Sequence, residues 1–423
     1  MAFTNEEMAR TLARAVAEQT DFAQRCQVAR RYYQNRNDIL HTGAVPRWQT
    51  QPNPLRNSDV RISHNWHSIL VNQKTSYLFS YAPTLDVGDR RLNARLTQML
   101  GDGYGKMMKD LCVEASNCGV AWLFLWLDDE RQLQMQVMDS EQIVPIYSDD
   151  LQKTLKAVLR IYTQRDEADQ PVTRCELWDE ETMQTGRWNG GQWVPDNQQI
   201  YYHGIGQIPF IPFWNNGEGT GDLEMYQGLI DQYDRVVSGF ANDLADIQEV
   251  IFVIRNYGGE DLGTFLGELK RYKAIKVDSD GGNSGVDTMQ IQIPVEARME
   301  FLELLKKQIF ISGHGVFPAQ DNLPNTSGVA LQYMYSLLEI KAGLLEVEFR
   351  QSLAQLARLL LRHMGCRKEL TIRQTWIRNA IRNETELAQI CADSSQLLSR
   401  ETILRHHPWV EDPQEEMESD GQE

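Results

Sequence analysis

The sequence predicts an α+β protein in which long amphipathic helices flank a block of antiparallel strands. Apolar side chains recur at helical spacing over about 30 residues from Asp222 onward. Residues 119–203, in contrast, break into short segments rich in β-branched and aromatic residues, separated by polar turns. With 423 residues, 42% of them hydrophobic, the chain is too long for a single compact core. Two or more core-forming regions are therefore expected.

The N-terminal third is predicted to be helical. Apolar positions at helical spacing indicate one or two helices within residues 5–36, and further helices at 65–78 and 92–115. Residues 43–54 contain three prolines and are expected to form a loop.

The strand block reads as an antiparallel meander. The pair Asn189-Gly190 marks one tight turn within it. The segment IPFIPFWNNGEG, residues 208–219, is expected to close the block as an extended strand and a loop.

The C-terminal half is predicted to contain long helices separated by a small insertion and a long loop. The helix that begins at Asp222 should end at Asn256, Gly258 and Gly259. Residues 313–328 hold three glycines and two prolines and are expected to form a long loop, of a kind that is usually functional or disordered. The remaining elements are an α/β insertion over 260–294 (helix 262–269, strands 274–277 and 289–293), helices at 294–311 and 329–364, a strand at 369–378 and a helix from 384.

The charge distribution argues against a conventional nucleic-acid-binding protein. The chain has 42 basic and 59 acidic residues, a net charge of −17, so it should repel phosphate backbones. Arg235 is the only basic residue of the first long helix before Arg255. The polar positions of that helix form an expected acidic strip: Asp222, Glu224, Asp231, Asp234, Asp243, Asp246 and Glu249.

Neither a membrane span nor a disulfide framework is expected. The longest apolar runs, such as residues 120–127, have the length of a strand and not of a membrane helix. The N-terminus MAFTNEEMAR lacks the apolar segment of a signal peptide, so the protein is expected to be made and kept in a cytoplasm. Six cysteines without a CxxC pair should be reduced, small buried side chains.

The search for catalytic motifs gives no candidate, and no catalytic, metal or cofactor site is expected. The segment GDGYGK at 101–106 departs from a phosphate loop, because Leu100 replaces its first glycine and Met107 follows the lysine. His406 and His407 are adjacent and cannot bind one metal from a regular helix. His64 and His67 could share a helix face, but packing or surface roles are favoured over a metal site.

The order of these segments resembles the portal proteins of long-tailed bacteriophages. The most specific stretch is GDLEMYQGLIDQYDRVVSGFANDLADIQEVIFVIRNYGGED, which is similar to the first stem helix of that family running into the clip. Five further segments follow the order of the family: NQKTSYLFSYAPTL, DSEQIVPIYSDD, QIPFIPFWNN, TSGVALQYMYSLLEIKA and SRETILRHHPWVEDPQEE.

The resemblance implies a homo-oligomeric ring, usually of twelve copies, at one vertex of a capsid within the virion. Double-stranded DNA would pass through it without sequence specificity, and the terminase, the major capsid or scaffolding protein and head-tail adaptors would be its partners. The implied parts are a wing (1–221 and 329–385), a stem (222–256 and 294–312), a clip (257–293), a tunnel loop (313–328) and a crown (386–423). Because the sequence stops at Glu423, a small crown is expected.

Three groups of residues are implicated in this function. Acidic stem residues would face the channel and let DNA slide, because a basic wall would bind the duplex tightly: Asp231, Asp234, Asp243, Asp246 and Glu249. The tunnel loop would contact DNA through Phe317, Gln320, Asp321, Asn322, Asn325, Thr326 and Ser327. The basic cluster of the clip would face protein partners, or be no more than a solvated surface: Lys270, Arg271, Lys273 and Lys276.

Two other functions stay open from the sequence. One is a different ring or scaffold component of the capsid, against which the two long helices bracketing an insertion argue. The other is a nucleotide- or metal-dependent enzyme with an unrecognised site, which would gain thermal stability when its ligand is added.

Overall fold

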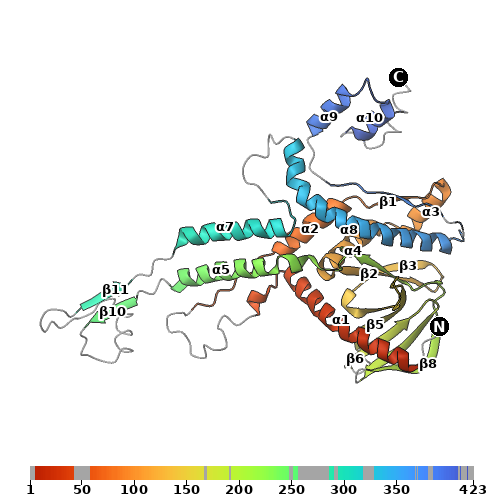
Figure 1. Ribbon diagram of the computed structural model, residues 1–423, viewed down its shortest axis with the longest axis horizontal. Coiled ribbons are helices and arrows are strands. Elements are labelled where there is room, and N and C mark those ends of the chain that lie inside the picture. The colour runs from red at the N-terminus through yellow and green to blue at the C-terminus, as the bar shows by residue number, and fades with distance from the viewer. Residues whose placement is uncertain are drawn as a thin grey trace. The chain divides into compact units, whose positions relative to one another are not determined.

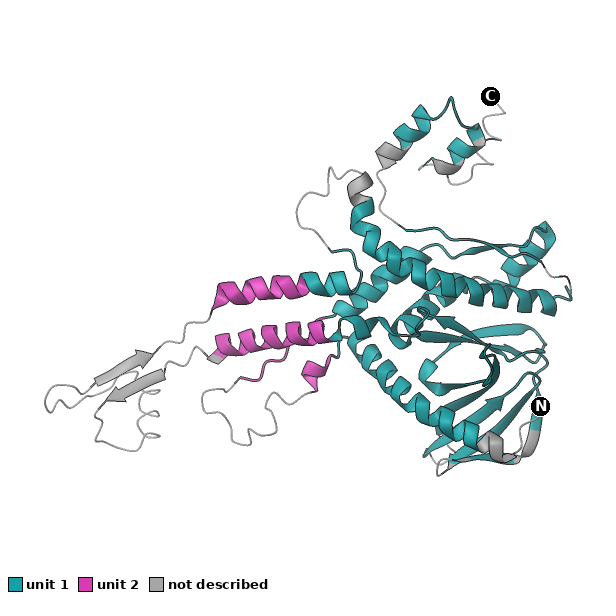
Figure 2. Cartoon of the chain, viewed as in Figure 1, with its two compact units in different colours: residues 1–36, 65–227, 307–423 teal, residues 37–64, 228–306 magenta. Residues whose placement is uncertain are grey.

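The structure is a computed structural model of the chain (Figure 1). It describes residues 5–41, 58–165, 169–189, 192–246, 251–255, 285–289, 294–317, 328–366, 368, 370–379, 384–407, 410 and 417. The chain divides into two compact units, drawn in two colours in Figure 2. Unit 1 comprises residues 1–36, 65–227 and 307–423, and unit 2 comprises residues 37–64 and 228–306. The α+β fold class is confirmed.

The helices of unit 1 largely follow the periodicity of the sequence. The long helices predicted within 5–36, at 65–78 and at 329–364 are confirmed, as is the one that starts at 384. Their bounds are α1 (Asn5–Tyr33), α2 (Trp66–Phe79), α3 (Arg90–Leu100), α4 (Tyr104–Cys118), α8 (Gly328–His363), α9 (Glu384–Asp393) and α10 (Arg400–His406), with short 3-10 turns η2 (Ser140–Gln142) and η3 (Asp222–Met225).

The prediction of one continuous helix over 92–115 is wrong, because two helices, α3 and α4, occupy this region. Gly101 has a φ of +68°, a left-handed conformation that ends α3, and α4 begins only at Tyr104. The segment GDGYGK therefore spans a break between two helices.

The strand block forms two sheets and not one meander. The first has the order β3-β2-β9, and the second the order β4-β5-β6-β7-β8. The single-meander prediction for 119–203 is wrong because β3 and β4 lie in different sheets; β9 pairs with the edge of β2 that β3 does not occupy. The bounds are β2 (Val120–Leu127), β3 (Leu133–Met138), β4 (Ile143–Tyr147), β5 (Leu155–Arg165), β6 (Pro171–Trp178), β7 (Thr182–Asn189), β8 (Gln192–Tyr202) and β9 (Phe210–Trp214).

Two predicted features of the strands are confirmed in part. Asn189 pairs with Gln192 across the predicted β7–β8 turn. The strand predicted at 369–378 shortens to β12 (Arg373–Thr375), which pairs with β1 (Thr84–Asp86).

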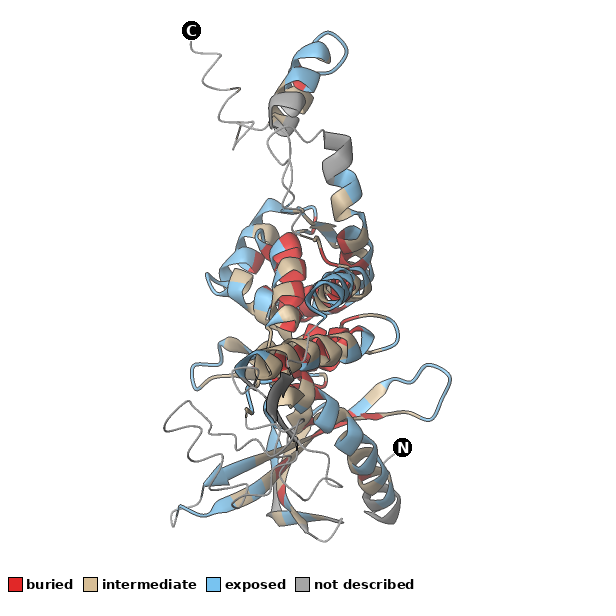
Figure 3. Ribbon diagram, turned by 90° about the vertical axis from the view of Figure 1, so that its left-hand side faces the viewer, coloured by how far each residue is buried: buried red, intermediate tan, exposed pale blue. Residues whose placement is uncertain are grey.

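The core of unit 1 lies where the helices pack on the sheets; its buried residues are red in Figure 3. α8 covers β9, and the ring of Phe349 contacts those of Phe213 and Phe79 at centroid distances of 5.0 and 5.7 Å. α1 covers the second sheet, with Leu12 packed in a cluster that includes Leu159. Burying side chains of this size contributes roughly 1.5–3 kcal/mol each.

Unit 2 contains most of two long helices and a two-stranded ribbon. α5 (Gln227–Asp246) and α7 (Val295–Ser312) lie side by side, because Arg298 donates to Asp243 at 2.6 Å and covers the ring of Phe240 at 5.5 Å. β10 (Ile251–Arg255) pairs with β11 (Gly285–Met289) in antiparallel register. A further turn, η1 (Asp38–Leu40), belongs to this unit.

The ribbon corrects the predicted first long helix. Residues 251–255 are a strand and not helix, because the apolar, β-branched run Ile251 to Ile254 finds a partner in residues far along the chain. Of the strand predicted at 289–293, Met289 belongs to β11, and residues 290–293 lie outside the described residues. The predicted helix at 262–269 and strand at 274–277 lie outside the described residues, as does the loop at 43–54.

Three further expectations can be compared with the structure. Five of the six cysteines are buried, as expected, whereas Cys366 is only half-buried. Among the described residues, no helix is both long and apolar enough to cross a bilayer. The helix α7 ends at Ser312 and α8 begins at Gly328, so the predicted long loop lies between these two helices.

Candidate functional site

A cluster of charged side chains lies in the interior of unit 1. Lys74 and Asp222 are each 1% exposed and Lys341 is 5% exposed. These three residues, called the buried triad below, come from α2, η3 and α8. Isolated buried charges are costly, so such a group must be paired and hydrogen-bonded.

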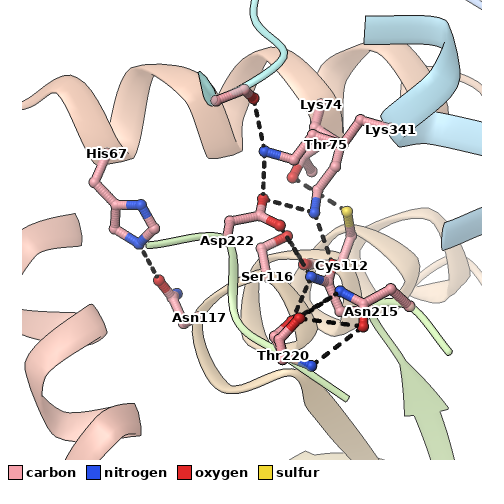
Figure 4. Close-up of polar contacts among 12 residues, drawn as sticks. His67, Lys74, Thr75, Cys112, Ser116, Asn117, Asn215, Thr220, Asp222 and Lys341 are labelled. Carbon is pink, nitrogen blue, oxygen red and sulfur yellow. Dashed lines mark hydrogen bonds and ion pairs between the residues drawn. The ribbon is translucent and has the colours of Figure 1, made fainter. Parts of the chain in front are cut away.

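The geometry of the triad satisfies this requirement (Figure 4). Oδ2 of Asp222 lies 2.7 Å from Nζ of Lys74 and 2.9 Å from Nζ of Lys341. Lys74 also donates to Oδ1 of Asn215 at 2.8 Å, and Asn215 donates to the other carboxylate oxygen at 2.9 Å. Lys341 donates to the carbonyl oxygen of Gly313 at 2.9 Å. The triad therefore joins three helical elements and the residue after α7.

A glycine-rich loop places Asp222 in the interior. The loop NNGEGTGD, residues 215–222, runs from β9 into η3. Gly119 has a φ of +85°, and a Cβ there would overlap the carbonyl group of Gly219. A Cβ on Gly221 would lie 2.6 Å from the carbonyl oxygen of Asn117. Only glycine permits this close approach of two backbone segments.

The electrostatics of the triad favour the ionised carboxylate. Burial alone would raise the pKa of Asp222, but the ammonium groups of Lys341 and Lys74 hold that pKa well below its usual range. Burial lowers the pKa of Lys341, while the carboxylate of Asp222 opposes that shift. Two ammonium groups face one carboxylate, so the triad carries one excess positive charge.

A second buried polar contact lies in unit 1. The ring of His67 is buried, with Nδ1 2.7 Å from the hydroxyl of Tyr226 and Nε2 2.8 Å from Oδ1 of Asn117. Because the Asn117 oxygen can only accept, Nε2 carries the proton and Nδ1 accepts from Tyr226. Burial lowers the pKa of His67 to about 4, so the ring is neutral at pH 7.

The first residues of the predicted tunnel loop contact α2. The side-chain amide of Gln73 donates to the carbonyl oxygen of Val316 at 2.9 Å and accepts from its N–H at 3.1 Å. The ring of Phe317 meets that of Phe310 edge-on at 5.3 Å. His314 adopts a φ of +51°, the left-handed conformation in which a helix commonly ends.

The expected acidic strip is only partly present as an exposed surface. Asp234 is fully buried, where it accepts from Asn37 at 2.6 Å and lies 2.7 Å from Nδ1 of His64. Asp243 is ion-paired with Arg298. The exposed-strip prediction is therefore wrong for Asp234 and Asp222, because periodicity cannot reveal partners from other segments.

Most other predicted site residues cannot be compared with the structure. Asp231 is partly buried on α5, and Asp246 lies in the last turn of that helix. Of the tunnel-loop group only Phe317 is described. The rest lie outside the described residues: Gln320, Asp321, Asn322, Asn325, Thr326 and Ser327, together with Glu249 and the basic cluster Lys270, Arg271, Lys273 and Lys276.

The sequence reasoning missed the buried triad, although a signal was present. Lys341 is the only charged residue between Glu339 and Glu346 in the apolar run IKAGLL. Lys74 lies in a predicted helix, and the residues three and four positions away from it, Leu70, Val71 and Leu78, are apolar. A single lysine within an apolar run is a candidate for a buried ion pair.

The histidine and metal alternatives find no support in the described part of the chain. His64 precedes α2 and pairs with Asp234, whereas His67 lies on α2 and contacts Tyr226 and Asn117. Within the described residues, no three His, Cys, Asp or Glu side chains are grouped to hold a metal ion.

Comparison with known proteins assigns the chain to a family. The family described as "Phage portal protein, SPP1 Gp6-like" matches residues 12–419. The portal protein of Clostridium phage phiCD119 is 43% identical over 407 residues, covering 92% of this chain and 90% of that protein. The portal protein of Bacillus phage SPP1 is 29% identical over 387 residues, covering 84% of this chain and 75% of that protein.

A solved structure is similar at a lower level. A chain from the virion of a native gene transfer agent particle matches 78% of this chain and 84% of its own length, with a TM-score of 0.41 and 12% identity. The family match over nearly the whole chain agrees with the resemblance drawn from the order of its segments. This chain belongs to the family of SPP1 Gp6-like phage portal proteins.

Proposed function

We propose that copies of this chain form a ring at one capsid vertex, with a central channel through which double-stranded DNA is packaged and later leaves. The observation that carries this proposal is the family match over residues 12–419. The ring would hold twelve copies and belong to the virion. It would serve as the docking platform for the terminase, the capsid or scaffolding protein and the head-tail adaptors.

Exposed apolar side chains on the two helices of unit 2 support lateral assembly. Leu244 on α5 is 50% exposed, and Met299 and Leu304 on α7 are each 52% exposed. Apolar side chains left in water along a helical pair favour association with another surface. In a ring of identical copies, one face of each copy packs against a different face of the next.

Acidic side chains support the sliding of DNA. Asp231, Asp246 and Glu249 are the proposed channel-facing residues, with Asp243 partly neutralised by Arg298. The net charge of −17 has the same sign as the phosphate backbone. A wall of lysine and arginine would release counterions and hold the duplex at every step, whereas carboxylates do not.

Two further groups are assigned by the resemblance to the family. The tunnel loop, residues 313–328, would contact DNA, and its described residues 313–317 are held by contacts with Gln73 and Phe310. The basic cluster of residues 270–276 would face protein partners, because it is a local excess of positive charge in an acidic chain.

A deletion of residues 318–326 tests the role of the loop. Particles assembled with this variant should contain normal rings but package or retain less DNA than wild-type particles. DNA-filled particles in wild-type yield would contradict the proposed DNA contact. Gel electrophoresis of DNA from purified particles measures the packaged genome directly.

A further inference from the structure

The buried triad connects the two segments by which the chain leaves and re-enters unit 1, and it joins both to the helix that follows the predicted tunnel loop. Asp222 belongs to η3, just before α5, along which the chain leaves unit 1 after residue 227. Gly313 follows α7, along which the chain returns at residue 307. Lys341 lies on α8, the helix that follows the predicted tunnel loop. One ammonium group thus joins the outgoing segment, the returning segment and the helix after the loop.

Lys341 also serves as a cap for the end of α7. The last carbonyl groups of a helix lack partners within the helix and carry a partial negative charge. Nζ of Lys341 donates to one of these groups, the carbonyl of Gly313, at 2.9 Å. This contact explains how the triad tolerates its excess positive charge, since the end of α7 supplies part of the missing negative charge.

The next residues of the chain are held by α2. Gln73 makes a two-point hydrogen bond to the backbone of Val316. A Cβ on Gly313 would lie 2.5 Å from Cδ1 of Leu70, and a Cβ on Gly315 would lie 2.9 Å from Oε1 of Gln73. The backbone at Gly313 and Gly315 therefore lies so close to α2 that a Cβ at either position would force the side chain of Leu70 or Gln73 to move.

We propose that Lys341, Asp222 and Gln73 are positioning residues that fix residues 313–316, the root of the predicted tunnel loop, within unit 1. The loop then starts from one defined point on a rigid core. The consequence for DNA rests on the proposed function, whereas the positioning itself does not. Residues 313–316 are called the loop root below.

Hydrogen exchange of the full-length protein, read by mass spectrometry, tests the positioning. Lys341→Met removes the cap but leaves Asp222 and Lys74 as a neutral ion pair, so unit 1 should stay folded. Amides of the loop root should exchange about tenfold faster than in the wild type, because the loss of one hydrogen bond changes the opening equilibrium by about that factor. Peptides of β2 and β9 should exchange as in the wild type.

A graded series at Gln73 distinguishes positioning from general stability. Gln73→Glu keeps an acceptor for the N–H of Val316 but loses the donor, and Gln73→Leu loses both. Exchange at the loop root should increase in the order Gln, Glu, Leu. Ser352→Ala is the matched control, because it removes a buried hydrogen bond from α8 to Pro212 away from the loop root.

Each outcome decides a separate claim. Unchanged exchange at the loop root in Lys341→Met and Gln73→Leu would overturn the proposal, as would an equal increase in every peptide of unit 1. Assembly of the same variants into particles tests the consequence for DNA. Faster exchange at the loop root with DNA-filled particles in normal yield would leave the positioning intact and contradict the DNA role of the loop.

Discussion

The ammonium nitrogen of Lys341 lies 2.9 Å from a carboxylate oxygen of Asp222 and 2.9 Å from the carbonyl oxygen of Gly313. Both charged side chains are almost completely buried. These contacts join segments that are distant in the sequence, so they stabilise the packing of unit 1 and not any single helix. The stability of unit 1 should depend strongly on the carboxylate of Asp222, which is the one negative charge of the triad.

Replacing the single carboxylate of the triad should destabilise unit 1 severely. Asp222→Asn leaves two buried ammonium groups without a counter-ion, and breaking a buried pair in this way costs about 3–5 kcal/mol. Urea denaturation followed by circular dichroism measures the change. Glu218→Gln is the control, since it removes the same charge from an exposed position of the same loop and should change stability by less than about 0.5 kcal/mol. Equal effects of the two variants would argue against the triad.

Stability should fall in mild acid because of His67. Its pKa is about 4 in the folded protein, below the ordinary value of 6.5, so the unfolded chain binds the proton more readily between these values. The neutral ring of His67 therefore contributes to the free energy of unfolding fully above pH 6.5. This contribution is lost as the pH falls toward 4, by about 3 kcal/mol in all. Denaturation midpoints measured from pH 7.5 to 4 test this expectation. His67→Gln should remove this part of the pH dependence, and an unchanged profile in that variant would contradict the assignment.

The approach of Gly119 to Gly219 should tolerate no side chain. Gly119→Ala adds a Cβ where the backbone is left-handed and meets a carbonyl group, so we expect a loss of about 1–3 kcal/mol or more. Gly343→Ala on α8 is the control: its Cβ would contact nothing within 4 Å, and alanine favours a helix by up to about 1 kcal/mol. Thermal unfolding of both variants should give shifts of opposite sign.

A charge on the exposed apolar face of α7 should prevent assembly. Leu304→Asp would place an unpaired carboxylate in every contact between neighbouring copies if that face is buried in the ring. Light scattering coupled to size exclusion should then report monomers under conditions in which the wild type forms rings. Lys307→Gln, an exposed change on the same helix with the same effect on net charge, should assemble normally. Rings of Leu304→Asp at wild-type concentration would show that the contact lies elsewhere.

The long helices could be predicted because their apolar periodicity is local. α1, α7 and α8 follow that pattern to within a few residues. Residues 251–255 were wrongly predicted as helix, because their apolar run also continues the helical periodicity and only pairing with residues 285–289 decides their structure. The break between α3 and α4 depends on the left-handed backbone of Gly101, which the helical pattern on both sides obscured.

The site was harder to predict than the fold, since burial of a charge depends on distant partners. Asp234 has the same sequence context as an exposed acid of an amphipathic helix, yet Asn37 and His64 enclose it. Asp222 is enclosed by Lys74 and Lys341, which come from separate helices. Family membership, in contrast, could be recognised from the order of segments over more than half of the chain.

Electron microscopy of the purified chain tests the central claim most directly. Averaged images of the wild-type protein should show closed rings of identical copies with a central opening wide enough for a DNA duplex. The wall of that opening should be acidic and should not retain DNA at physiological salt. Closed particles without an opening, or a basic wall that holds the duplex, would contradict the account.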